Sequence, residues 1–222
     1  MLSGALGLVP NIVHGFGTRE NPFPEEIKPY RGSLARLRQV HGINVIEARA
    51  PGEDLSDGDA AFTRVKLLPV GVYTADCVPV LLARKDGAAV AAVHAGWRGT
   101  RARILRQVWN RISTSLQSGP EDPKNWVAAI GPAIGPCCYE VGKDLAEEFE
   151  REFSEFSRIA VPSSCILDLP AINAEELKAL GFGSVDLFRA CTRCAGNDFG
   201  HMFHSHRRER DGSRQWSGIV IL

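Results

Sequence analysis

Three side chains that commonly bind transition metals stand at or beside the ends of apolar segments. They are His41 in RQVHG, Cys77 in TADCVPVLL, and His94, which closes the apolar run VAAVH. Two imidazoles and one thiolate suit zinc, and three protein ligands leave a fourth tetrahedral position for water or substrate. These residue types predict a catalytic zinc site. Their wide spacing differs from the tight ligand pairs of a zinc finger, so ordinary core roles for Cys77 and His94 stay open.

A fixed positive charge, Arg98, follows His94 in the segment HAGWRGT. Thr100 is a suitable N-cap, and the residues after it predict a helix with one apolar side. That side consists of Ile104, Leu105, Val108, Ile112 and Leu116. Arg98 would lie beside the start of this helix, where a guanidinium group and free backbone N–H groups both favour an anion. We therefore predict that Arg98 binds an anionic part of the substrate, with a surface ion pair as the alternative.

Two other segments carry candidate substrate-binding residues. Arg207, in HSHRRERDG, is predicted to contact an anion, although charged runs are more often solvated surface. Cys137, in GPCCYE, is predicted to contact substrate. Cys137 and Cys138 also permit a nucleophilic role, which would need an adjacent base and a lowered thiol pKa.

The elements that must position these residues include short apolar strands. Segments 70–74, 78–83 and 88–93 are rich in valine, and Lys85-Asp86-Gly87 predicts a hairpin turn between the last two. Their hydrophobicity is continuous rather than alternating, which is typical of strands that are covered on both faces. We therefore expect functional side chains at the ends of these strands.

The rest of the chain alternates strands and helices only loosely. Further strands are predicted at 126–130, 185–188 and 218–222, and further helices at 143–153 and 171–180. Because at least one pair of strands forms a hairpin, a mixed sheet of the α+β class is favoured over a strictly parallel sheet. No repeat or long linker divides residues 1–222, so we predict a single domain.

Composition and charge exclude several classes of protein. The 222 residues include 26 basic and 26 acidic side chains, so no net field attracts nucleic acid or an anionic membrane. No apolar run approaches the roughly 18 residues of a membrane helix, and the first residues lack the features of a signal peptide. Six cysteines in such a chain favour a reducing compartment, where thiols serve metals or chemistry. We predict a cytoplasmic protein with small-molecule ligands and without nucleic-acid or membrane partners.

Several motifs occur in order over nearly the whole chain. They are HGFGTR (14–19), RQVHG (38–42), DGDA (57–60), TADCVPVLL (74–82), VHAGWRGT (93–100), AAIGPAIGPCCYEVG (128–142), CT (191–192) and FHSHRR (203–208). This set resembles the laccase-domain family, also called multicopper polyphenol oxidase or peptidoglycan editing factor, which includes proteins named purine nucleoside phosphorylase. The resemblance implies that His41, Cys77 and His94 bind zinc and that the fold is a layered α/β/β/α arrangement. Residues 20–37 form a shorter segment than is usual in the family, so we expect one wall of the pocket to differ, which bears on substrate choice more than on the three metal ligands.

Two metal-dependent activities are disfavoured by the residues present. A multicopper oxidase needs a type-one copper plus a trinuclear cluster, for which the available imidazoles are too few. The histidines number six: His14, His41, His94, His201, His204 and His206. Deamination by the cytidine-deaminase route needs His-x-Glu, but Gly96 stands two residues after His94. Zinc is therefore preferred over copper as the cofactor.

The resulting prediction is a zinc-dependent purine nucleoside phosphorylase that acts on adenosine, inosine or methylthioadenosine, with adenosine deamination as an additional family activity. Phosphate attacks the anomeric carbon while the base departs, so the site must hold an anion and stabilise charge on the base. Three alternatives stay open. They are a hydrolase that edits mis-charged muramyl-peptide precursors of peptidoglycan, a copper-dependent polyphenol oxidase, and a non-catalytic metal-binding partner protein.

Overall fold

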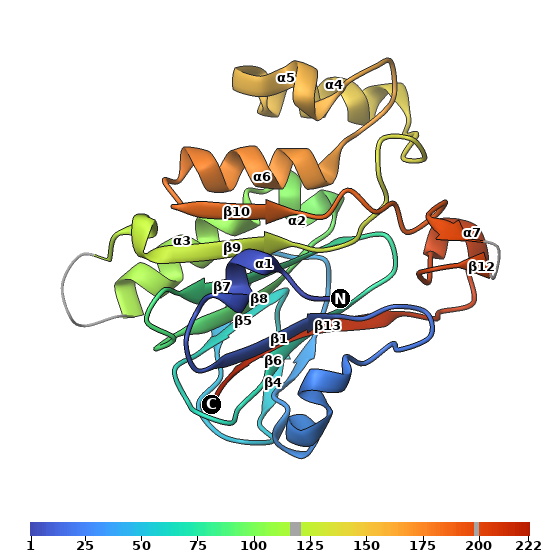
Figure 1. Cartoon of the computed structure of the whole chain (residues 1–222). Helices are drawn as coiled ribbons and strands as arrows, with labels where there is room; N and C mark the ends of the chain where they lie inside the picture. Colours follow the sequence, from blue (N-terminus) through green and yellow to red (C-terminus); the bar gives the residue numbers. More distant parts are fainter. Residues whose placement is uncertain (116–120, 198–199) are drawn as a thin grey trace.

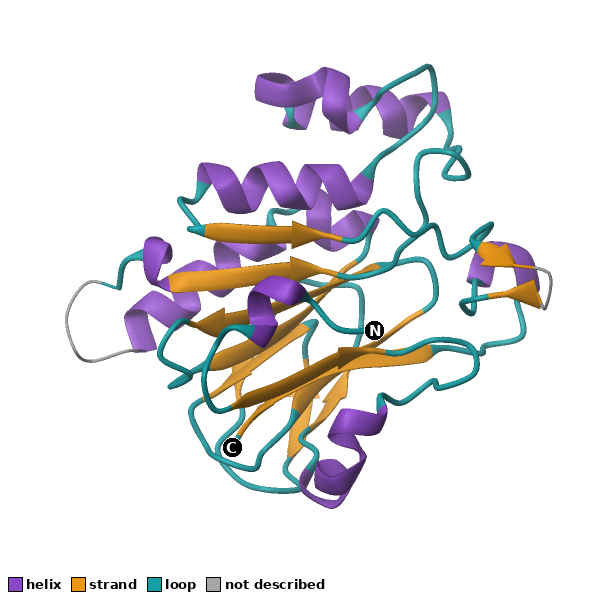
Figure 2. Cartoon of the chain, in the orientation of Figure 1, coloured by secondary structure: helices purple, strands orange, loops and turns teal. Residues whose placement is uncertain are grey.

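Two β-sheets pack face to face, with helices outside them (Figures 1 and 2). The computed structural model describes residues 1–115, 121–197 and 200–222, so Leu116 of the predicted helix lies outside the described residues. The larger sheet has six strands in the order β10-β9-β7-β8-β5-β3. These strands are β3 (Val45–Glu47), β5 (Ala60–Thr63), β7 (Val78–Arg84), β8 (Val90–Ala95), β9 (Trp126–Ile130) and β10 (Ser184–Leu187). The β3–β5 and β10–β9 pairs are parallel and the other pairs are antiparallel, which makes the sheet mixed.

The smaller sheet has three antiparallel strands in the order β1-β13-β6. They are β1 (Ile12–Phe16), β13 (Gln215–Ile221) and β6 (Val70–Thr74). Two further pairs of short strands lie outside both sheets. These are β2 (Arg36–Arg38) with β4 (Asp54–Asp57), and β11 (Gly196–Asn197) with β12 (Gly200–His201).

The helices lie mainly on the outer face of the six-stranded sheet, with α4 and α5 farther out than α6 (Figure 1). This group consists of α2 (Trp97–Arg101), α3 (Ile104–Ser115), α4 (Lys143–Glu152), α5 (Ser157–Ala160) and α6 (Leu169–Ala179), with the short 3-10 helices η2 (Pro123–Asn125) and η3 (Ser154–Phe156). The 3-10 helix η1 (Glu25–Ser33) covers the three-stranded sheet, α1 (Gly4–Gly7) contacts strands of both sheets, and α7 (His206–Glu209) precedes β13. The predicted α+β class and the layered α/β/β/α arrangement are confirmed.

Strands β7 and β8 show why their hydrophobicity is continuous. In β8, Ala91 and Val93 pack in the core beneath the helices, whereas Val90 and Ala92 pack between the two sheets. Both faces of the strand are therefore buried, and a polar residue would have a solvated side only near the strand ends. His94, the titratable residue of β8, accordingly lies next to the last position of the strand.

The start of the helix after His94 differs from the sequence prediction. The chain turns helical at Trp97, with Gly96 as the N-cap, so Thr100 lies inside α2 rather than capping it. Gly96 provides no side-chain cap, and the Cβ of any other residue there would lie 3.2 Å from the Cys77 sulfur. Close approach to the cysteine explains glycine at this position better than helix propensity does.

Replacing Gly71 with alanine should destabilise the fold strongly. A Cβ at this position would overlap the indole ring of Trp216, which is buried between Gly71 and Gly218. We expect a loss of about 3 kcal/mol in the free energy of unfolding, because the buried ring has no room to move. Urea denaturation measures this loss. Gly32→Ala is the matched control, since a Cβ there meets no atom within 4 Å, and equal unfolding midpoints for the two variants would contradict the packing argument.

Within the described residues, no helix combines the length and apolarity needed to cross a membrane.

Candidate metal centre and substrate pocket

The fold brings His41, Cys77 and His94 together from three separate segments. Their ligand atoms all lie within 4.8 Å of one another, and the two imidazole rings meet edge to face at 4.8 Å between centroids. Cys77 immediately precedes β7, and His94 lies on β8, which pairs with β7 so that His94 stands opposite Pro79. His41 follows β2 in a loop. Neighbouring strands therefore place the thiol and one imidazole, while the loop supplies the second imidazole.

A buried carboxylate, Asp59, orients two of these residues. Its Oδ1 lies 2.7 Å from His94 Nδ1, and its two oxygens accept the backbone N–H groups of His41 at 2.9 Å and Gly42 at 2.6 Å. Because a carboxylate accepts and does not donate, His94 donates its Nδ1 proton to Asp59 and presents Nε2 to the centre. Carboxylate–histidine pairs of this kind orient metal ligands. The motif DGDA did not by itself assign Asp59 a role; the available signal was an acidic residue directly before a buried strand.

His41 has an unusual backbone conformation that the same carboxylate maintains. Its φ is 60°, in the left-handed region that non-glycine residues rarely adopt. Asp59 accepts the N–H groups of both His41 and Gly42, so the carboxylate holds this turn in place. The left-handed conformation costs free energy locally, and the hydrogen bonds to Asp59 offset this cost.

The ionisation of Cys77 and His94 also suits a metal centre. Burial raises the pKa of the Cys77 thiol, but hydrogen bonds from His41 and His94 lower it more, to about 6. Burial lowers the pKa of His94, but Asp59 and the Cys77 thiolate raise it more, to about 9. In the metal-free protein the pair is thus a thiolate beside an imidazolium at neutral pH. A thiolate is the form of cysteine that binds metals, so the donor set fits zinc.

These pKa values predict a pH-dependent zinc affinity. Between about pH 6 and 9, Cys77 is already a thiolate, whereas His94 must release one proton before its Nε2 can bind a metal. Since protons compete with zinc, the affinity should rise about tenfold for each pH unit in this range. Competition with a chromophoric chelator at pH 6.5, 7.5 and 8.5 would measure this affinity. Zinc bound by a Cys77→Ala variant is subtracted, so that only zinc at the His41–Cys77–His94 centre is counted. A flat profile would contradict the assigned ionisation.

Replacing Asp59 with asparagine should weaken metal binding without abolishing the site. The amide keeps the shape of the side chain but loses the charge that orients His94, and such changes typically reduce metal affinity by about 10- to 100-fold. Asp57→Asn is the matched control, because Asp57 lies two residues away and pairs with Arg38 on the surface. Equal zinc affinities for the two variants would remove Asp59 from the positioning role.

A pocket of about 420 Å³ opens beside the three candidate ligands. Its wall includes three aromatic rings and three guanidinium groups, which belong to Tyr73, Trp97, Tyr139, Arg98, Arg207 and Arg214. The volume is in the range of small-molecule sites. Burial raises the pKa of the Tyr139 phenol to about 12, so it remains a neutral hydrogen-bond donor at physiological pH.

The arginine residues give this pocket a positive charge. Arg98 is exposed on the first turn of α2, and its guanidinium lies 4.3 Å from the Trp97 ring centroid. In residues 1–115, 121–197 and 200–222, the guanidinium groups of Arg98, Arg207 and Arg214 form no ion pair with a carboxylate. The surface ion pair considered for Arg98 is therefore not found there. Arg214 was not singled out by the sequence analysis, because a charged run gives no sign of which arginine faces a pocket.

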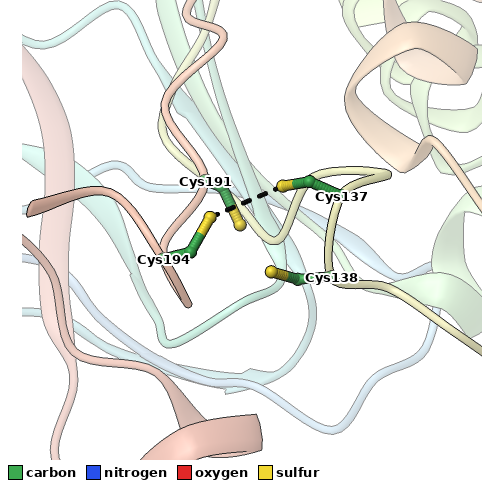
Figure 3. Close-up of side chains that lie close together, drawn as sticks. All are labelled: Cys137, Cys138, Cys191 and Cys194. Carbon is green, nitrogen blue, oxygen red and sulfur yellow. Dashed lines mark hydrogen bonds between the residues drawn. The ribbon is translucent and has the colours of Figure 1, made fainter.

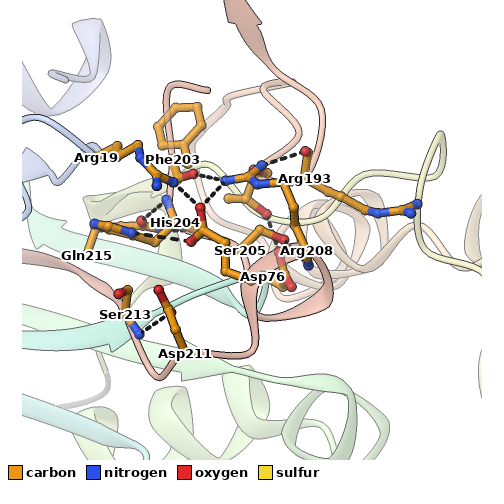
Figure 4. A network of polar contacts seen from close by, with 12 residues as sticks. Arg19, Asp76, Arg193, Phe203, His204, Ser205, Arg208, Asp211, Ser213 and Gln215 are labelled. Atoms are coloured by element: carbon orange, nitrogen blue, oxygen red, sulfur yellow. Dashed lines mark hydrogen bonds and ion pairs between the residues drawn. The ribbon is translucent and has the colours of Figure 1, made fainter. Parts of the chain in front are cut away.

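Asp76 connects the metal centre to the opposite wall of the pocket. Its carboxylate accepts the Thr192 hydroxyl at 2.6 Å and the Arg207 backbone N–H at 2.6 Å. The neighbouring Arg208 donates to the backbone carbonyls of Arg193 and Phe203, as Figure 4 shows. Arg207 itself lines the pocket, and its guanidinium donates to the Glu140 carbonyl at 3.0 Å. Asp76 thus positions Arg207, the second arginine singled out by the sequence analysis.

Cys137, the remaining sequence-predicted substrate residue, lies outside the described lining of this pocket. Its thiol groups with those of Cys138, Cys191 and Cys194 (Figure 3). From the same loop, Ile134 and Tyr139 reach the pocket instead.

Comparisons with relatives, with solved structures and with a family model all indicate the same family. The chain is 36% identical over 186 residues to a purine nucleoside phosphorylase of Xylella fastidiosa, and the matched region covers 80% of this chain and 68% of the relative. It is 32% identical over 201 residues to adenosine deaminase RL5 of an unknown prokaryotic organism, with 84% and 74% covered. A solved structure from Neisseria meningitidis matches with a TM-score of 0.74 and 27% identity over 96% of this chain and 95% of that one. Residues 23–222 match the family described as multi-copper polyphenol oxidoreductase laccase, and the chain belongs to that family.

Proposed function

We propose that this protein is a zinc-dependent purine nucleoside phosphorylase that uses His41, Cys77 and His94 as zinc ligands and acts on adenosine, inosine and methylthioadenosine. The observation that carries the proposal is the set of three arginines, without carboxylate partners among the described residues, in a pocket beside the candidate ligands. A pocket this rich in positive charge suits an anionic reactant. Relatives named purine nucleoside phosphorylase support a nucleoside as the other reactant.

Phosphorolysis assigns a task to each part of the pocket. A phosphate oxygen forms a bond to the anomeric carbon of the sugar, and the bond between that carbon and the purine breaks. Arg98, Arg207 and Arg214 bind and orient the phosphate, because guanidinium groups match its geometry and charge. The rings of Tyr73 and Trp97 offer apolar faces to a purine.

His41, Cys77 and His94 would hold the zinc ion, which when bound would supply a Lewis acid to stabilise negative charge. Asp59 keeps His94 in the tautomer that binds, and the covered strands β7 and β8 keep the ligand atoms in place. Gly96 allows the backbone of α2 to approach these ligands closely.

Adenosine deamination is the second candidate, favoured by the relative named adenosine deaminase RL5. Deamination replaces the amino group of the base with oxygen from water, so it needs no phosphate. The same pocket can bind the nucleoside for either reaction.

The two reactions are separated by incubating the zinc-loaded protein with adenosine and with inosine, with and without inorganic phosphate. We expect release of adenine and hypoxanthine only when phosphate is present. Ammonia release from adenosine without phosphate would identify deamination. Absence of both reactions would contradict the proposal and direct attention to muramyl-peptide precursors, to phenolic substrates with copper, or to a purely metal-binding role.

A further inference from the structure

Four cysteine thiols gather at one place away from the His41–Cys77–His94 centre. They belong to two loops, one with Cys137 and Cys138 and one with Cys191 and Cys194, and they converge as Figure 3 shows. All four sulfur atoms lie within 4.8 Å of one another, and the Sγ atoms of Cys137 and Cys194 are 3.5 Å apart. More than 50 residues separate the two pairs along the chain, so only the fold brings them together.

The distances fit four thiolates around a single ion. Zinc–sulfur bonds of about 2.3 Å place the sulfurs of a tetrahedral site about 3.8 Å apart. The Cys137 and Cys194 sulfurs, 3.5 Å apart, lie within a few tenths of an ångström of this spacing. No other pair is farther apart than 4.8 Å, so each pair reaches the tetrahedral spacing with a change of at most about 1 Å. An iron–sulfur cluster binds its cysteines on several different iron atoms, which holds the thiols farther apart. A single tetrahedral ion with four sulfur ligands is typical of zinc.

Backbone contacts hold the thiols in place before any ion binds. The turn at Cys191 closes through the Ala195 N–H, which donates to the Cys191 carbonyl at 2.8 Å, and Cys191 and Cys194 stand in the spacing Cys-x-x-Cys. The Gly135 N–H donates to the Cys191 sulfur at 3.3 Å, a contact that supports a negatively charged sulfur. The Thr192 N–H donates to the Ala133 carbonyl at 3.0 Å and fixes one loop against the other. The site is thus preorganised.

A positive charge lies next to the cluster. The guanidinium of Arg208 donates to the carbonyls of Thr192 and Arg193, the two residues between Cys191 and Cys194. Four thiolates around a divalent ion carry a net charge of minus two, and a neighbouring cation offsets part of it. The cluster is also reachable from solvent, since Cys137 and Cys194 are exposed.

We propose that Cys137, Cys138, Cys191 and Cys194 bind one zinc ion at a structural site distinct from the His41–Cys77–His94 centre. Four protein ligands fill the tetrahedron and leave no position for substrate, which is the arrangement of a structural zinc site. Binding releases the thiol protons to solvent and changes no oxidation state.

The consequence of this site is a fixed pocket wall. The first loop contributes Ile134 and Tyr139 to the pocket, and the second holds Asp76 through the Thr192 hydroxyl. Zinc across the two loops would fasten this wall to the segment that carries Arg207. The inference concerns metal content and stands independently of the nucleoside reaction.

The first test counts zinc in protein purified under reducing conditions from zinc-supplemented cells. We expect two zinc ions per chain in the unaltered protein and one in Cys77→Ala, which retains all four thiols of the cluster. Cys194→Ser should lose the other ion, whereas Cys165→Ser, which changes a half-buried free cysteine outside both groups, should retain two. A Cys77→Ala protein without zinc would overturn the proposal.

A second test uses the unaltered chain, because a variant that lacks a structural ion can fail to fold. Alkylation with iodoacetamide is mapped by mass spectrometry before and after removal of zinc with a chelator. Zinc should protect Cys137 and Cys194 at least tenfold, although both are exposed, and should leave Cys165 unaffected. Equal labelling with and without zinc, or a Cys137–Cys194 disulfide in freshly reduced protein, would overturn it.

Discussion

Replacing Cys77 with alanine should remove one zinc ion per chain and lower the rate of nucleoside phosphorolysis by about 1,000-fold or more. Cys77 is the anionic ligand among three, since its thiol pKa of about 6 makes it a thiolate at neutral pH. Without it, two imidazoles remain, and two ligands hold zinc weakly. Metal analysis and steady-state rates with inosine measure both effects on the same sample.

The control for this variant is Cys165→Ala, which removes a half-buried thiol outside both groups of candidate ligands. It should keep the zinc content and the rate of the unaltered protein. If Cys77→Ala retained full zinc content, the assignment of the metal centre would be wrong. If it lost zinc and kept its activity, the metal would have no part in the reaction.

Replacing Arg98 with alanine should raise the KM for phosphate by about 50-fold and change the KM for inosine little, because a charge-assisted contact contributes about 2–3 kcal/mol. Arg98 lines the pocket, lies against Trp97 and has no carboxylate partner among the described residues. Its charge is therefore available to an anion. Initial rates over a range of phosphate concentrations at saturating inosine measure the effect.

Arg101→Ala provides the comparison on the same helix. Arg101 is the last residue of α2 and pairs with Glu148 on the surface, so its removal should leave the phosphate dependence unchanged. An Arg98 variant with an unchanged phosphate KM would show that Arg98 does not bind phosphate. Arg207 and Arg214 would then be the remaining candidates in the pocket.

The strands were the most predictable part of this fold. The segment 126–130 coincides with β9, and the hairpin turn at Lys85-Asp86-Gly87 joins β7 to β8 as expected. Burial on both faces gives these strands long apolar runs, which a sequence reveals directly. The predicted start of this helix, with Thr100 as the N-cap, was wrong, because the N-cap is Gly96. Glycine is needed there for close approach to the Cys77 sulfur and provides no capping side chain that a sequence would reveal.

The site was predictable only in part. The residue types and the family motifs directed attention to His41, Cys77 and His94, and the fold brings them together. Asp59 and Arg214 were not predicted. The role of Asp59 depends on its hydrogen bond to His94, and that of Arg214 on the pocket, and both form only when the chain folds. The four-cysteine cluster was not predictable for the same reason: the fold brings Cys137 and Cys194 together, and no spacing rule along the sequence links them.

The most direct test of the phosphorylase proposal follows the fate of phosphate during the reaction. In a mixture of zinc-loaded protein, inosine and inorganic phosphate, phosphorus NMR should show a sugar phosphate ester that forms in step with hypoxanthine. The Cys77→Ala variant should form neither product. Hypoxanthine accompanied by free ribose, with inorganic phosphate unchanged, would instead identify a hydrolase and contradict the account.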